Sequence, residues 1–201
     1  MRSIDQALED LAEIRSSLNR AETFRGYRSA SIMATSVVAW IGCSLQSRWV
    51  DPKTPELNDF LTLWIRIALF CAVLSFGEVF VRYWRSGPMF RHMTRSAVAP
   101  MIPALLSGLA LTVVIAWYAP EVGWMLPGLW SMVFGLGVAA SARFLPKLVS
   151  LVALYFVVSG LLCIVLATRG WAYSPWLMGL SFGGGQMLSA AVLYWALEKG
   201  E

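Results

Sequence analysis

Six long apolar stretches, separated by short polar or basic segments, follow one another along the chain. Each is about 20 residues long, which as an α-helix covers the roughly 30 Å hydrocarbon core of a bilayer. The pattern predicts an all-α, polytopic integral membrane protein with a single six-helix transmembrane domain over residues 29–197. We expect the spans to cover approximately residues 29–47, 60–83, 98–118, 124–142, 148–168 and 175–197.

The second stretch, residues 60–83, carries charged residues inside its apolar run. Arg66 lies about two turns from one end, where its side chain either snorkels to the interface or needs a partner from another span. Glu78 precedes Arg82 by four residues, which is the spacing and order of a helical ion pair. Because an ionised carboxylate within lipid is costly, Glu78 is interpreted either as part of that structural pair or as a proton or cation site.

Residues 1–28 lack a long apolar run and predict a cytoplasmic segment without a cleavable signal peptide. Within residues 3–24, Ile4, Leu11 and Leu18 are seven apart and mark one face of an amphipathic helix. This helix either lies on a surface or docks a protein partner or a second copy of the chain. Aromatic and basic side chains then alternate before the first span and predict an interfacial anchor, formed by Phe24, Arg25, Tyr27 and Arg28.

The balance of charge predicts the orientation. The sequence is 58% hydrophobic and 14% charged with a net charge of +4, whereas soluble domains carry about 25% charged residues. Most Lys and Arg residues flank the spans on the side of the N-terminus, so we expect both termini, including the short tail 198–201, to be cytoplasmic in a cell (inner or plasma) membrane. Basic residues beside apolar spans favour anionic lipid head groups over nucleic acid as partners.

Glycine is concentrated in the fourth and sixth stretches. Gly179 and Gly183 form a GxxxG pair, which allows two helices to approach closely. The run continues through two more glycines to Gln186, and such a run either packs tightly or breaks the helix to form a solute site. We expect the fourth span, with Gly135 and Gly137, to be the helix that packs against Gly183.

A short motif recurs in the three even-numbered stretches. Leu74-Ser75-Phe76-Gly77 matches Leu180-Ser181-Phe182-Gly183, and Met132-Val133-Phe134-Gly135 resembles both. The pattern suggests three parallel helical hairpins, each made of one outgoing and one returning span. Chance recurrence within apolar segments is the alternative, since such segments use few residue types.

No residue pattern predicts catalysis or a bound cofactor. The three cysteines lie in apolar stretches without CxxC spacing, and His92 is the single histidine. We therefore expect no enzymatic activity, no metal and no cofactor. Two functions remain: a sensor, scaffold or accessory subunit that acts through its N-terminal helix and basic inner loops, or a small carrier or channel that uses Arg66, Glu78 and Gln186.

Overall fold

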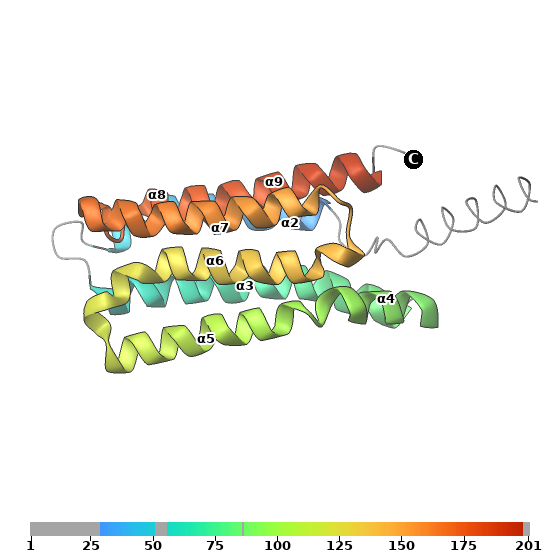
Figure 1. Ribbon diagram of the computed structural model, residues 1–201, viewed down its shortest axis with the longest axis horizontal. Helices are drawn as coiled ribbons and strands as arrows, with labels where there is room; N and C mark the ends of the chain where they lie inside the picture. Colours follow the sequence, from blue (N-terminus) through green and yellow to red (C-terminus); the bar gives the residue numbers. More distant parts are fainter. Residues whose placement is uncertain (1–28, 51–55, 86, 199–201) are drawn as a thin grey trace, which may run out of the picture.

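The computed structural model describes residues 29–50, 56–85 and 87–198, and within these ranges the chain is helical with no strand (Figure 1). Five long helices and a sixth, interrupted one lie side by side. The long helices are α2 (Ser29–Trp49), α3 (Leu57–Arg85), α5 (Met101–Tyr118), α6 (Leu126–Ser141) and α7 (Val149–Leu166). The interrupted helix consists of α8 (Pro175–Met178), the π-helical segment η4 (Gly179–Gly184), α9 (Gly185–Leu193) and the π-helical segment η5 (Tyr194–Glu198).

Six helical segments of the described chain are long and apolar enough to cross a membrane. The predicted all-α architecture and the number of apolar spans are therefore confirmed. The predicted N-terminal helix (residues 3–24), the anchor formed by Phe24, Arg25, Tyr27 and Arg28, and residues 199–201 of the tail lie outside the described residues.

Proline marks where several of these helices begin. Pro88 and Pro175 occupy first-turn positions, Pro100 is the N-cap of α5, and Pro127 lies in the first turn of α6. The first turn has no intrahelical acceptor for its N–H groups, so proline costs nothing there while its fixed φ favours the helix. Between α5 and α6 the chain makes a 3₁₀ segment, η1 (Pro120–Met125).

The basic segment after α3 differs from the prediction. It was expected to be a loop, but it forms a separate helix, α4 (Pro88–Val98), that precedes α5. The Arg91 guanidinium donates to the carbonyls of Tyr83 at 3.0 Å and Trp84 at 3.2 Å, and lies over both rings. Because the last carbonyls of a helix lack intrahelical donors, Arg91 caps the end of α3 and holds α4 against it.

The helices follow one another in the order α5, α6, α7, α8–α9, α2 and α3, each packed on the next. Viewed from the side, α2, α7 and α8–α9 form one layer and α3, α5 and α6 the other (Figure 1). The first helix of this order, α5, and the last, α3, are not among the closely packed pairs. The arrangement therefore has two free edges, one along α3 and one along α5.

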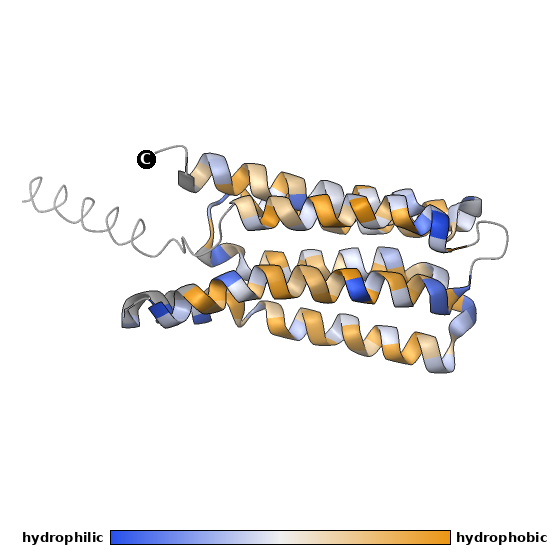
Figure 2. Ribbon diagram, turned by 180° about the vertical axis from the view of Figure 1, so that it is seen from behind, coloured by the Kyte–Doolittle hydropathy of each residue, from blue (hydrophilic) through white to orange (hydrophobic). Residues whose placement is uncertain are grey.

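Apolar residues run along all the long helices (Figure 2), and many of them are exposed on the outside of the bundle as well as buried inside it. The largest exposed fractions belong to Trp117 and Tyr118 at about 80% and to Val73 at 71%. Inside the described part of the chain, three apolar clusters form the core. The two larger ones lie around Phe156 and around Phe60 and Leu126, which are fully buried, and the smallest contains Cys163 and Leu177. A surface this apolar across many neighbouring residues fits contact with lipid rather than water.

Candidate functional site

A cavity of about 520 Å³ lies inside the bundle and is lined by residues of α2, α3, α5, α6, α7 and the α8–α9 helix. Its exposed lining residues belong only to α3 and α5, and they include Leu69 and Leu109. These are the two helices that do not pack closely on each other. The cavity therefore opens sideways, between α3 and α5, toward the apolar surroundings of the bundle.

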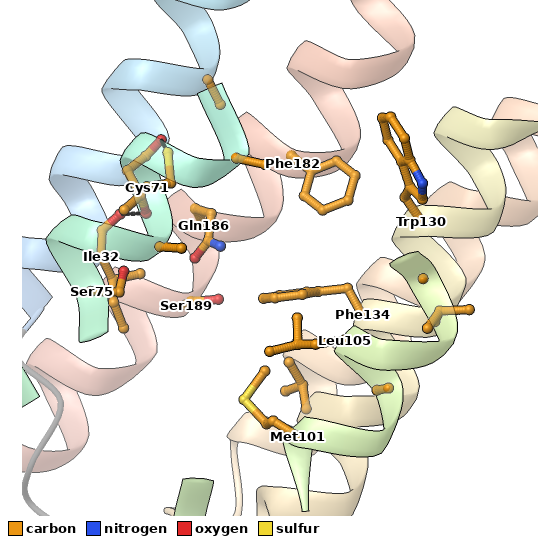
Figure 3. Close-up of a pocket in the computed structure, with 18 of the residues that line it drawn as sticks. Ile32, Cys71, Ser75, Met101, Leu105, Trp130, Phe134, Phe182, Gln186 and Ser189 are labelled. Carbon is orange, nitrogen blue, oxygen red and sulfur yellow. Dashed lines mark hydrogen bonds between the residues drawn. The ribbon is translucent and has the colours of Figure 1, made fainter. Parts of the chain in front are cut away.

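The walls are mostly aliphatic and aromatic. Phe134 and Phe182 line the cavity together with Trp130, and the two phenylalanine rings lie 5.9 Å apart (Figure 3). Both rings rest on the fully buried Phe156, at 4.9 Å and 5.8 Å respectively. Aromatic pairs at these separations attract one another, so the three rings form one packed wall.

The polar lining groups fall into two classes. Some are satisfied within the protein: Thr112 donates to the Gly108 carbonyl at 2.7 Å and accepts from Trp130 Nε1 at 2.8 Å, while Ser189 donates to the Gly185 carbonyl at 2.8 Å. Among the described residues that line the cavity, none is acidic or basic.

The other class lacks partners within the described part of the chain. Neither the side-chain amide of Gln186 on α9 nor the hydroxyl of Ser75 on α3 makes a hydrogen bond there, and Figure 3 shows both residues on the cavity wall. The buried hydroxyl of Ser141, which also belongs to the lining, has no partner either. A free amide surrounded by apolar side chains costs free energy unless a ligand or water satisfies it.

The three predicted intramembrane polar residues do not converge. Gln186 faces the cavity, whereas Arg66 is exposed on the outside of α3 and Glu78 is half-buried farther along the same helix. Neither charged residue lines the cavity. Arg82, the predicted partner of Glu78, has its side chain outside the described part of the structure.

The glycines lie at close helix contacts. A Cβ placed on Gly183 would lie 2.8 Å from Nε1 of Trp40, and one on Gly179 would lie 2.9 Å from Sγ of Cys43. Both neighbours belong to α2, so the expectation that the fourth span packs against Gly183 is wrong. A Cβ on Gly135 would lie 2.9 Å from Cβ of Phe156 on α7, and one on Gly137 the same distance from Cβ of Ala104 on α5.

The wide turn η4 leaves backbone carbonyls that side chains of neighbouring helices satisfy. Ser36 of α2 donates to the Gly183 carbonyl at 2.7 Å, and Tyr155 of α7 donates to the Leu180 carbonyl at 2.6 Å. π-Helical turns disturb the regular hydrogen-bond ladder, and in lipid each released group needs another partner. The glycine run is thus packed closely on α2, and its Leu180 and Gly183 carbonyls are bonded to neighbouring helices.

A polar network that the sequence did not predict closes the bundle at the end opposite α4. Trp64 Nε1 of α3 donates to Gln46 Oε1 at 2.8 Å, and Gln46 Nε2 of α2 donates to the Tyr173 carbonyl at 2.5 Å. Gln46 and Trp64 are 1% and 2% exposed. Tyr173, which precedes α8, packs its ring on Phe60 at 5.1 Å, and burial raises the pKa of its hydroxyl.

One sequence signal could have located the cavity. The recurring motif places a phenylalanine at the same position of three spans, and all three rings, Phe76, Phe134 and Phe182, line this one cavity. Ser75, which was not among the predicted site residues, belongs to the first copy of the motif and also lines the cavity. The threefold hairpin repeat itself stays a prediction.

Neither a metal site nor a known relative points to a function. Among the described residues, no group of His, Cys, Asp or Glu side chains could hold a metal ion. Comparison of the chain with protein families, with curated proteins and with solved structures gives no match.

Proposed function

We propose that this protein is a non-catalytic integral membrane protein, of the sensor or accessory class, that takes up a hydrocarbon-rich ligand from the bilayer. The observation that carries the proposal is the cavity of about 520 Å³ that opens sideways between α3 and α5. Small-molecule sites in proteins are typically apolar pockets of about 300–1,000 Å³ with few polar groups. The size and the lining of this cavity match that description.

The position of the opening supports a ligand that arrives through lipid. Leu69 of α3 and Leu109 of α5, on the two sides of the opening, are 62% and 61% exposed. A ligand passing between them leaves one apolar environment for another, so it does not have to cross water. Burial of a hydrocarbon chain in this cavity also gains dispersion contacts with the packed aromatic wall.

The same geometry argues against the predicted carrier that would use Arg66, Glu78 and Gln186. Conduction of a polar solute needs polar groups along a continuous path, and two of these three residues lie away from the cavity. The described lining contains no charge that would attract or relay an ion.

Photolabelling in lipid nanodiscs tests the proposal. The probe is octadecane carrying a diazirine at mid-chain, and labelled residues are identified by mass spectrometry. We expect labelling around Phe134 to saturate with probe concentration and to be displaced by unlabelled octadecane. Labelling around the exposed Trp117 should instead rise linearly, because that residue faces bulk lipid.

A matched pair of variants separates cavity binding from general partition into lipid. Ala72 lines the cavity, so Ala72→Phe should abolish the saturable labelling. Ala110 is exposed on α5 and does not line the cavity, so Ala110→Phe should leave it unchanged. Linear labelling at every site of the wild-type protein would refute the proposal.

A further inference from the structure

We infer that the cavity selects an uncharged lipid-soluble compound that carries a hydroxyl or carbonyl oxygen, and that Gln186 is the residue that recognises this oxygen. The inference rests on the proposed function, because it names the chemistry of the ligand of the same cavity. It depends on three observations: the absence of charge in the described lining, the free amide of Gln186, and the placement of Ser75 on the facing helix.

The first observation excludes charged head groups. Moving an isolated ionised group into apolar surroundings costs far more than moving a neutral polar group. No acidic or basic side chain among the described lining residues could offset that cost for a carboxylate, phosphate or ammonium. A ligand bound inside the cavity is therefore neutral.

The second observation requires an oxygen on the ligand. The Gln186 side chain projects into the cavity from α9 and makes no hydrogen bond within the described part of the chain (Figure 3). An amide offers two N–H donors and one carbonyl acceptor. A hydroxyl on the ligand can donate to it and accept from it, and a carbonyl oxygen can accept from it, whereas a plain hydrocarbon leaves the amide unsatisfied.

The third observation provides a second contact. Ser75 lies on the α3 wall next to the region that Gln186 faces, and its hydroxyl is also without a partner among the described residues (Figure 3). Two hydrogen-bonding groups from facing helices can bind one oxygen between them. The rings of Phe134 and Phe182 then contact the apolar body of the ligand.

The depth of Gln186 narrows the ligand class further. Gln186 lies 11 residues beyond Pro175, or about 16 Å along a helix that spans about 30 Å of hydrocarbon. A phospholipid keeps its charged head group at the interface and cannot bring it to this depth. A long-chain alcohol, a sterol-like alcohol or a quinone-like carbonyl compound carries its oxygen into the hydrocarbon region.

The test compares three probes that share one chain. Octadecane, octadecan-1-ol and octadecylamine, each with a mid-chain diazirine, are titrated against the wild-type protein in nanodiscs, and the concentration for half-maximal labelling around Phe134 is measured. We expect the alcohol to label at about tenfold lower concentration than the alkane, which corresponds to about 1.4 kcal/mol, in the range of one hydrogen bond. The amine should label least.

Two variants test whether Gln186 is responsible for the preference for the alcohol over the alkane. Gln186→Leu should raise the half-maximal concentration of the alcohol to that of the alkane, and Ser75→Ala should raise it by a smaller factor. Ser107→Ala is the matched control, since Ser107 is exposed on α5 and does not line the cavity, and it should leave the preference intact. The comparison of the three probes on the wild-type protein needs no variant and remains decisive if Gln186→Leu fails to fold.

The outcomes separate the two proposals. If all three probes give saturable labelling with equal half-maximal concentrations, the role of Gln186 is refuted, while the proposed apolar binding cavity is not. A preference for the alcohol that persists in Gln186→Leu would have the same meaning. Absence of saturable labelling with every probe overturns the proposed function itself.

Discussion

Replacement of Gln46 by leucine provides the sharpest test of how this bundle is held together. Gln46 joins three segments, because its side chain bonds to Trp64 of α3 at 2.8 Å and to the Tyr173 carbonyl at 2.5 Å. Leucine keeps most of the volume but removes both hydrogen bonds. We expect Gln46→Leu to fold with the same six helices and to unfold at lower denaturant or temperature.

The size of the effect follows from burial. Hydrogen bonds between transmembrane helices contribute about 0.6 kcal/mol on average and up to about 1.7 kcal/mol. Gln46 and Trp64 are 1% and 2% exposed, so water cannot replace the lost partner of the indole N–H, and values near the upper limit apply. Two such bonds predict a loss of about 2–3 kcal/mol in the free energy of unfolding.

The assay is reversible unfolding in mixed micelles, followed by tryptophan fluorescence. Gln46→Leu, Trp64→Phe and the double variant form a double-mutant cycle, which should give a coupling energy of about 1 kcal/mol or more. Ser44→Ala is the control, because that exposed hydroxyl bonds only to its own helix, at the Trp40 carbonyl. Additive effects within about 0.3 kcal/mol in the cycle would refute the reasoning, because the bond between α2 and α3 would then contribute nothing.

Two further predictions concern packing and pH. Gly183→Leu should lower the melting temperature in detergent by the equivalent of about 1–3 kcal/mol, because the new side chain collides with Trp40. Gly77→Leu is the control and should leave the melting temperature unchanged, because a Cβ at Gly77 has no neighbour within 4 Å. Equal melting temperatures of the two variants would contradict the packing argument. Burial raises the pKa of Tyr173 above its ordinary value of 10.0, so above pH 10 the unfolded state loses this proton first and stability falls as the pH rises through the folded pKa. Tyr173→Phe should therefore lose less stability than the wild-type protein above pH 10 in a thermal-unfolding series. Identical slopes of stability against pH for the two proteins would contradict this prediction.

The spans themselves could be predicted because lipid imposes a simple requirement. A segment that crosses hydrocarbon must be apolar and about 20 residues long, and the sequence shows six such segments. Helix α4 could not be recognised by this criterion, since its 11 residues are too few and too polar for a span. Its position depends on Arg91 meeting the end carbonyls of α3, a contact that exists only after the two helices fold together.

The contact at Gly179 and Gly183 shows what a local sequence pattern does not predict. The spacing of Gly179 and Gly183 indicates a groove along one helix face, but it does not identify the helix that fills the groove. Trp40 fills it because α2 lies beside the α8–α9 helix, and that neighbourhood depends on the order of all six helices. The cavity gives a second example. Gln186 could be identified from the sequence as a polar residue in an apolar span, but the α3 residues that line the same cavity could not.

The wide turn between α8 and α9 has a consequence for the phase of the helix. Met178, Phe182 and Gln186 are spaced four apart and all line the cavity. In a regular α-helix the eight residues from the first to the last would rotate about 800°, which leaves Gln186 about 80° out of line with Met178. The π-helical turn η4 takes up this difference, so it aligns the amide with the rings above it. A homologue one residue shorter here could replace the wide turn by a regular α-helix and keep the same face, because seven residues rotate about 700° and leave Gln186 only about 20° out of line with Met178. Loss of the wide turn at constant length would instead rotate Gln186 by about 80°, away from the cavity.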